Sequence, residues 1–247
     1  MPGSFWRHVN TVLKESDIII EVLDARMIEE TRHWELEDKV RRLGKILLYV
    51  VTKCDLEQKE VVEQRTRQLH PSVFISARDK LGTTILKHKI LELAKGKKVV
   101  VGVVGYPNVG KSSLINALAG RNAARTSARS GYTKGVQKVR LGAKLALLDT
   151  PGVFPSMEKD TVKYAKTAAI DSSKIRDPEV AALKIIEENM SLIKTFYGVS
   201  GDEPEEVLEH IAEVLHRLTK GGKPDLEVTA RLVLQDWQRG KIHKTTY

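Results

Sequence analysis

Short apolar runs recur along the first part of the chain, separated by longer segments in which apolar residues return with a helical period. Runs rich in β-branched residues predict buried strands, and the amphipathic segments between them predict helices. We expect strands at 17–23, 46–51, 72–75, 99–104, 136–141 and 144–148. We expect helices at 9–15, 34–43, 56–69, 83–95 and 111–119. Strands alternating with helices predict an α/β fold, a mostly parallel sheet with helices on both faces.

From residue 160 onward this alternation stops and the pattern is helical throughout. Asp177-Pro178 predicts an N-cap followed by proline at the first helical position. Asp202 precedes an acidic first turn, and Pro224-Asp225 opens a helix that Gly240 closes. We therefore expect two domains, an α/β domain at residues 1–156 and a small all-helical domain at residues 157–247.

A glycine-rich loop lies between the strand at 99–104 and the helix at 111–119. It reads Gly105-Tyr106-Pro107-Asn108-Val109-Gly110-Lys111-Ser112-Ser113. This matches G-x-x-x-x-G-K-[ST], the P-loop, whose backbone N–H groups cradle phosphates at a helix N-terminus. We expect Lys111 to lie between the β- and γ-phosphates and Ser112 to bind magnesium. Further nucleotide contacts are expected from Asn108, Val109, Gly110 and Ser113. A chance glycine turn is the alternative, and the strand and helix that flank the loop argue against it.

A D-x-x-G sequence, Asp149-Thr150-Pro151-Gly152, follows the last expected strand. We expect Asp149 to support the magnesium ion, Thr133 to bind the ion when GTP is present, and the N–H of Gly152 to contact the γ-phosphate. Lys111, Thr133 and Gly152 are thus the expected catalytic groups, because phosphoryl transfer needs positioning and charge neutralisation. Val153 stands where Ras-like proteins carry a water-orienting glutamine, so hydrolysis by the protein alone is expected to be slow.

Two further loops bear on which base is bound. Thr52-Lys53-Cys54-Asp55 resembles N-K-x-D, in which the aspartate accepts hydrogen bonds from guanine and the lysine lies along the base. Ser76-Ala77-Arg78 resembles S-A-K, which presents backbone N–H to the guanine oxygen. Both follow expected strands, at the sheet edge where α/β proteins bind ligands. Adenine lacks the donors that Asp55 would accept, so GTP/GDP is expected rather than ATP.

These pieces stand in an unusual order, because the two base-recognition loops precede the P-loop. Either residues 1–98 form an unrelated domain or the GTPase domain is circularly permuted. Permutation is physically accessible because domain termini often lie close together. The strand pattern, split around residue 98, favours permutation.

In its motifs the chain resembles the circularly permuted GTPases of the YlqF/RbgA family. The resemblance includes Asp24-Ala25-Arg26, the permuted motif order, 220–225 and 234–241. It implies GTP hydrolysis with magnesium, action in large ribosomal subunit assembly, and rRNA contacts made partly by the helical domain. Three departures stand out. Thr52 replaces the usual asparagine, which should weaken one tie to the base and to the P-loop. Met27 to Glu29 lack the proline expected after Asp-Ala-Arg, and Ser4 replaces the family histidine, with His8 four residues later. Asn108 stands where potassium-dependent GTPases place a potassium ligand; an asparagine that caps its own turn is the alternative.

The charge balance agrees with a polyanionic partner: 41 Lys and Arg against 32 Asp and Glu give +9. Candidate phosphate contacts lie in 121–144 and in a tail containing Lys220, Lys223, Arg231, Arg239, Lys241 and Lys244; solvated faces are the alternative. Trp237 follows a helical apolar pattern and is expected in the core. With one cysteine, no membrane-length apolar run and no DNA motif, we expect a cytoplasmic monomer that binds rRNA. The rival functions are a nucleotide-dependent assembly factor without significant hydrolysis, and a P-loop ATPase or kinase.

Overall fold

The computed structural model describes residues 3–120, 137–150, 161–167, 170 and 172–243. The chain divides into two compact units, residues 1–158 and 159–245. This division falls two residues after the boundary that the sequence predicts at 156. Across the described ranges, no helix combines the length and the apolar character needed to cross a membrane.

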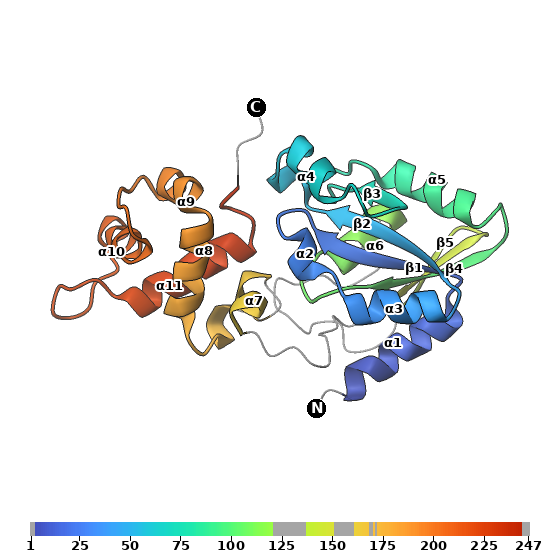
Figure 1. The fold of residues 1–247 in the computed structure, drawn as a ribbon, viewed down its shortest axis with the longest axis horizontal. Coiled ribbons are helices and arrows are strands. Elements are labelled where there is room, and N and C mark those ends of the chain that lie inside the picture. Colours follow the sequence, from blue (N-terminus) through green and yellow to red (C-terminus); the bar gives the residue numbers. More distant parts are fainter. Residues whose placement is uncertain (1–2, 121–136, 151–160, 168–169, 171, 244–247) are drawn as a thin grey trace. The chain divides into compact units, whose positions relative to one another are not determined.

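The first unit is built on a six-stranded sheet in the order β3-β2-β1-β4-β6-β5 (Figure 1). The strands are β1 (Ile18–Asp24), β2 (Ile46–Thr52), β3 (Ser72–Phe74), β4 (Val99–Val104), β5 (Gln137–Leu141) and β6 (Leu145–Asp149). Neighbouring strands run parallel, except that β5 is antiparallel to β6. The predicted ends of all six agree with the structure to within one residue. For the parallel strands the reason is that buried parallel strands appear as mostly apolar runs. The antiparallel β5 instead alternates polar and apolar residues.

β1 occupies a central position and joins the two parts of the sequence that the P-loop separates. Ile18 pairs with Ile46 of β2 on one side and with Val101 of β4 on the other. Residues 1–98 are therefore part of the same sheet as the P-loop strand, and the interpretation as an unrelated domain is wrong. The circular permutation is confirmed, and the base-recognition loops and the P-loop leave the same edge of the sheet.

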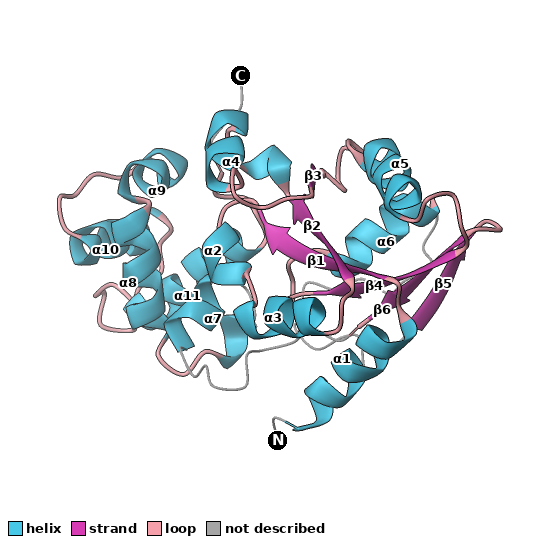
Figure 2. Cartoon of the chain, turned by 45° about the vertical axis from the view of Figure 1, so that its right-hand side comes forward, coloured by secondary structure: helices cyan, strands magenta, loops and turns pink. Residues whose placement is uncertain are grey.

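Helices cover both faces of this sheet, as predicted. α1 (Gly3–Glu15) and α3 (Trp34–Arg42) lie on one face, and α5 (Thr83–Leu93) and α6 (Lys111–Ala119) lie on the other (Figure 2). Side chains of α1, α3 and the sheet form one buried cluster. Close packing explains Gly102, where a Cβ would lie 2.4 Å from Cγ1 of Val12. The sheet is thus fixed in position beneath the loops at its edge.

The largest difference from the predicted helices follows β2. The sequence predicts one helix at 56–69, whereas the structure has η1 (Cys54–Leu56) and then α4 (Lys59–Arg65). Glu57 interrupts the helix with an extended conformation, φ −142° and ψ 156°. This extended residue separates the short turn carrying Asp55 from the amphipathic helix. The structure also adds α2 (Ile28–Thr31) and begins α1 at Gly3 rather than at residue 9.

The second unit is helical in its described part. It contains α7 (Thr161–Lys166), η2 (Ser172–Lys174), α8 (Pro178–Glu188), α9 (Met190–Tyr197), α10 (Pro204–Val214) and α11 (Leu226–Gln238). Pro178 begins α8 and the Asp225 side chain accepts a hydrogen bond from Val228 N at 3.1 Å, so both predicted helix starts are confirmed. The N-cap of α10 is Glu203, one residue after the predicted Asp202. Trp237 is buried in the core, as predicted.

Candidate nucleotide site

The predicted phosphate loop connects β4 to α6. The backbone turns at Gly105 and Gly110, whose φ angles of 146° and 104° favour glycine. A Cβ on Gly105 would lie 2.7 Å from the carbonyl oxygen of Val22, so the backbone of β1 excludes a side chain there. Gly110 is the N-cap of α6, and the unpaired N–H groups at a helix N-terminus favour anions. The loop therefore has the backbone geometry that a phosphate group requires.

Lys111 is folded back over this loop. Its ammonium donates to the carbonyl oxygens of Gly105 at 3.0 Å and Tyr106 at 2.5 Å. Burial lowers the pKa of Lys111 to about 8, an effect that the carboxylate of Asp149 partly offsets. A bound phosphate would supply the compensating negative charge that this buried ammonium has only in part.

Ser112 and Asp149 meet beside the helix N-terminus. The Ser112 hydroxyl donates to Oδ2 of Asp149 at 3.2 Å. Oδ1 of Asp149 is buried and has no hydrogen-bond partner among the described residues, and burial raises the pKa of this carboxyl group. Two neighbouring oxygen donors, one of them buried without a partner, fit the oxygen chemistry of magnesium. The third predicted ligand, Thr133, lies outside the described residues.

The two base-recognition loops also come together in space. The Ser76 hydroxyl lies 2.8 Å from Oδ1 of Asp55, and the Arg78 guanidinium lies 3.2 Å from Oδ2. The Asp55 side chain is 11% exposed, whereas that of Arg78 is 61% exposed. Ala77, between Ser76 and Arg78, is half-buried. Residues 21 positions apart thus place a mostly buried carboxylate at the strand ends, as the sequence predicts for a base-reading aspartate.

Thr52 links the base-recognition loop to the P-loop. Its hydroxyl lies 2.9 Å from the carbonyl oxygen of Leu23 and 2.5 Å from that of Val109. One hydroxyl has one proton, so it donates to only one of these oxygens at a time. The side chain also lies against Gly110, where a Cβ would be 3.3 Å from Oγ1 of Thr52. The expected weakening of the tie to the P-loop is therefore compensated by the threonine hydroxyl, while its effect on base binding stays a prediction.

Sequence reasoning placed Lys53 along the base and did not assign a role to Asp24. In the structure Asp24, Arg26 and Lys53 form a buried ionic group, the Asp24 cluster. Oδ2 of Asp24 lies 2.8 Å from Nη2 of Arg26 and 2.7 Å from Nζ of Lys53, and Oδ1 lies 3.0 Å from Nε of Arg26. Although burial alone would raise it, these two cations hold the pKa of Asp24 well below its usual value. The sequence signal available for this cluster was Asp24-Ala25-Arg26, a charged segment at the end of a predicted strand.

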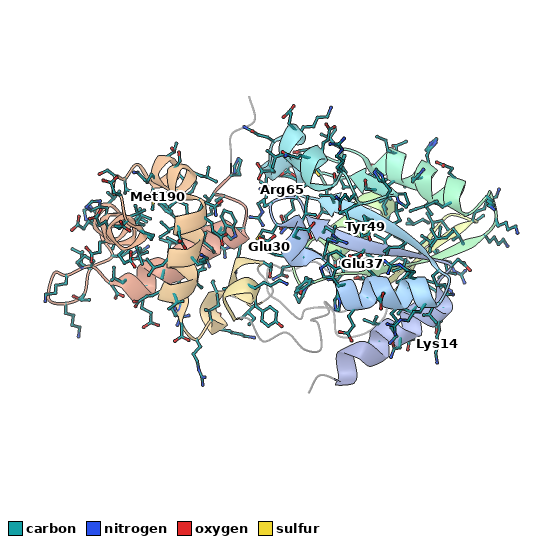
Figure 3. All side chains as sticks on the ribbon, in the orientation of Figure 1. Lys14, Glu30, Glu37, Tyr49, Arg65 and Met190 are labelled. Carbon is teal, nitrogen blue, oxygen red and sulfur yellow. The ribbon has the colours of Figure 1, made fainter. Side chains whose placement is uncertain are left out.

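A second polar group, the Glu21 cluster, lies beside the same strand and comprises Glu21, Arg32, His33, Glu37 and Tyr49. The Tyr49 hydroxyl donates to Glu37 at 2.9 Å, and both of these residues are labelled in Figure 3. Arg32 pairs with the same carboxylate at 2.9 Å. The His33 N–H, at the N-cap of α3, donates to Glu21 at 2.7 Å. Burial, assisted by the charge of Glu37, raises the pKa of Glu21 well above its usual value.

For the remaining predicted site residues, the structure gives the backbone conformation or exposure but no contact that indicates a role. Asn108 has a φ of 60°, Val109 is buried and Ser113 is exposed. Gly152 and Val153 lie outside the described residues. Ser4 and His8 belong to α1, and the part of the chain described gives no hydrogen-bond partner for Nδ1 of His8.

Residues 100–225 of the chain match the model of the protein family described as 50S ribosome-binding GTPase. Curated relatives include the uncharacterized GTP-binding protein MJ1464 of Methanocaldococcus jannaschii, 43% identical over 95% of this chain and 65% of the relative. GTPase grn1 of Schizosaccharomyces pombe is 33% identical over 94% of this chain and 59% of its own. Nuclear GTP-binding protein NUG1 of Saccharomyces cerevisiae is 33% identical over 94% of this chain and 54% of its own length. The chain therefore spans just over half to two thirds of these relatives.

Solved structures of YlqF share the fold. The GNP-bound YlqF of T. maritima superposes with a TM-score of 0.69 at 22% identity, covering 96% of this chain and 94% of that one. The GDP-bound form superposes with a TM-score of 0.70 at 22% identity, covering 96% of each chain. The permuted fold inferred from motif order is thus found in an independent structure of similar extent.

Proposed function

Because the chain belongs to the family of 50S ribosome-binding GTPases, we propose that it is a GTP-hydrolysing switch that binds the large ribosomal subunit or its precursor and assists its assembly. Eukaryotic relatives are named as a GTPase and as a nuclear GTP-binding protein, which supports a related role here. The observation that carries the nucleotide assignment is the meeting of Asp55 and Ser76 at the sheet edge from which the P-loop also leaves.

In this proposal each side of the site has one task. The backbone N–H groups of the P-loop and the Lys111 ammonium hold the phosphates, while Asp55 accepts from the donors of guanine. Ser112 and Asp149 hold magnesium, which neutralises charge on the transferring phosphoryl group when bound. Thr133 and the N–H of Gly152 complete the proposed set of residues that respond to the γ-phosphate.

The base assignment is tested with Asp55→Asn. Exchanging a carboxylate for an amide replaces an acceptor with a donor, so we expect GDP affinity to fall at least about 100-fold. Xanthosine diphosphate, which has a carbonyl oxygen where guanine has an amino group, should bind the variant better than it binds the wild type. Asp38→Asn, at an exposed ion pair with Arg41 and Arg42, is the matched control and should retain wild-type preference. Unchanged guanine preference in Asp55→Asn would contradict the assignment of Asp55, whereas a wild-type preference for ATP over GTP would favour a P-loop ATPase or kinase.

Hydrolysis is proposed to be slow alone and faster on the ribosomal partner. Single-turnover hydrolysis, measured with and without purified large subunits, distinguishes this from an assembly factor that does not hydrolyse GTP. An unchanged hydrolysis rate in the presence of subunits would favour the assembly factor that does not hydrolyse GTP.

Asn108 is proposed as a potassium ligand, and equal hydrolysis rates in potassium and sodium buffers would contradict that part of the proposal.

Ion pairs in the second unit show which of the candidate phosphate-binding cations are already paired with a carboxylate. Arg231 pairs with Glu227 at 2.8 Å, and Lys241 pairs with Asp236 at 2.7 Å. Lys220 and Lys223 instead lie in an exposed turn, 216–223, and have no ion-pair partner in the described chain. In the described part of the second unit, the unpaired exposed cations among the candidates are therefore Lys220, Lys223 and Arg239. Lys138, Arg140 and Lys144 of the first unit are also exposed, and the remaining candidates in 121–134 and Lys244 lie outside the described residues.

A salt series tests the RNA proposal. Replacing both Lys220 and Lys223 by glutamine should lower the salt dependence of binding to large subunits by about 1 to 2 units in log–log slope. Arg41→Gln/Arg42→Gln removes the same charge from α3 and is the control. Equal slopes in wild type and the lysine variant would exclude this turn, and binding independent of salt would contradict RNA contacts altogether.

A further inference from the structure

The Asp24 cluster lies at the carboxyl ends of β1 and β2, beside the loop that carries Asp55. Its two cations converge on one oxygen: Oδ2 of Asp24 is 2.8 Å from Arg26 and 2.7 Å from Lys53. The Asp24 and Arg26 side chains are 0% and 4% exposed, whereas that of Lys53 is 22% exposed. Asp24 is thus a fixed anion, and Lys53 is the member of the cluster that reaches toward solvent.

The anion itself is held from several sides. Arg26 binds both carboxylate oxygens, the Arg26 backbone N–H donates to Oδ1 at 3.1 Å, and the Asp24 backbone N–H donates to Thr31 at 3.1 Å. Arg65 of α4, labelled in Figure 3, donates to the backbone oxygen of Arg26 at 3.0 Å. Three hydrogen bonds from Arg26 therefore hold the carboxylate itself, two more hold the backbone of Asp24 and Arg26, and the same carboxylate makes one contact with Lys53.

Lys53 also has a constrained backbone. Its φ of 58° and ψ of 33° place it in the left-handed region, which a residue with a side chain adopts only where its surroundings require it. Backbone and ammonium are both fixed, so the four-carbon stem between them has little freedom left. A free lysine side chain loses much rotamer entropy on being ordered, and here that ordering is done before any ligand binds.

We propose that Asp24 is a positioning residue for nucleotide binding: it anchors the Lys53 ammonium and thereby preorganises the Lys53 stem for contact with a purine base. This inference rests on the proposed base site at Asp55 and Ser76. Asp24 does not touch the nucleotide itself; it acts through Lys53.

A double-mutant cycle on GDP affinity tests the proposal, measured by titration with a fluorescent GDP analogue on the full chain. Asp24→Asn should weaken GDP binding about tenfold, because Lys53 must then be ordered by the ligand. Lys53→Met should weaken binding to a similar extent, and the double variant should bind no more weakly than the weaker single variant. Asp38→Asn is the control, because Asp38 is likewise a carboxylate that pairs with two cations, here Arg41 and Arg42; it should leave GDP affinity unchanged.

Full additivity of the Asp24→Asn and Lys53→Met losses would overturn the proposal, as would wild-type affinity in folded Asp24→Asn. If Asp24→Asn does not fold, Asp24→Asn/Arg26→Gln neutralises the buried pair together and still leaves Lys53 unanchored, so the same loss is expected and wild-type affinity overturns the idea. Failure of the base assignment is distinguishable, because Asp55→Asn would then leave guanine preference unchanged. If Asp55→Asn loses the guanine preference of the wild type but the cycle shows no coupling between Asp24 and Lys53, the base assignment stands and this inference alone is contradicted.

Discussion

Two carboxyl groups on one strand, those of Glu21 and Asp24 of β1, have pKa values shifted in opposite directions. Both residues are 0% exposed. Burial and the neighbouring charge of Glu37 raise the pKa of Glu21, while Arg26 and Lys53 overcome burial and lower the pKa of Asp24. Burial acts in the same direction on the pKa of both groups, so the charges packed against each carboxyl group decide which form is favoured.

The difference follows from position along the strand. Glu21 lies in mid-strand, pairs in register with Tyr49, and accepts from the N-cap of α3. Asp24 lies at the carboxyl end, where the chain turns and brings Arg26 and Lys53 within reach. A charged group is thus maintained at the edge proposed to bind nucleotide, while the group inside the fold is favoured in its neutral form. Four changes break or sharpen this contrast.

Asp24→Asn should have the largest effect on stability. It leaves two cations converging on a neutral amide, so we expect a loss of about 3 kcal/mol in the free energy of unfolding at neutral pH. The stabilising effect of Asp24 is present above its unfolded value of 3.8 and is lost as pH falls toward its lower folded pKa. The difference between variant and wild type should therefore shrink in acid. Denaturant unfolding at pH 7 and pH 3 measures it, and a pH-independent difference would contradict the charge argument.

Tyr49→Phe should be intermediate. It removes the hydroxyl that donates to Glu37 at 2.9 Å and leaves the ring in place. A hydrogen bond to a charged group contributes about 1.5 kcal/mol, so a loss near that size is expected. The same denaturant titration applies. Phe74→Leu, a change at a partly buried aromatic residue outside the Glu21 cluster, is the control for a loss of packing alone.

Glu21→Gln should remove a pH dependence rather than a large amount of stability. A raised folded pKa contributes stability that is fully present below about 4.5 and is lost as pH rises through the folded pKa. Glutamine does not titrate, so the variant should gain on the wild type between pH 4.5 and pH 7.5, and should lie within about 1 kcal/mol of it at the acid end. Parallel stability curves for the two proteins would show that Glu21 is ionised like an ordinary glutamate.

Asp38→Asn should have the smallest effect. Its carboxylate pairs with Arg41 and Arg42, but all three side chains are well exposed, at 47%, 73% and 80%. Exposed ion pairs contribute about 0.5 kcal/mol or less and are screened by salt. Thermal unfolding at low and high salt measures this change. A loss comparable to that of Asp24→Asn would show that shared charge alone, without burial, accounts for the contrast.

The sequence predicted most of the fold because its parallel strands are mostly apolar runs bounded by glycine, proline and charged residues, and because β5 alternates polar and apolar residues. The P-loop was predictable because its spacing has one mechanical meaning, and Asp55 and Ser76 because both follow strands. The helix at 56–69 was wrong in extent because helical periodicity continues through Glu57, where tertiary structure requires an extended residue. A local signal was available for the pairing of Asp24 with Arg26, two positions away, but not for its contact with Lys53, which is 29 positions away. The contact of Thr52 with Val109, 57 positions away, was likewise not predictable from a local pattern.

By itself, then, the sequence determined the local elements, the permuted order of the motifs and the residue types that are proposed to bind phosphate and base. These follow from periodicity, backbone propensity and side-chain chemistry, which act over short distances along the chain. Only the tertiary structure decided that β1 joins the two halves of the sheet, and that Glu21 and Asp24 differ in charge. The reason is that desolvation and Coulomb interactions depend on distances in space, and packing brings Lys53, Arg32 and Glu37 to β1 in an arrangement that no local pattern encodes.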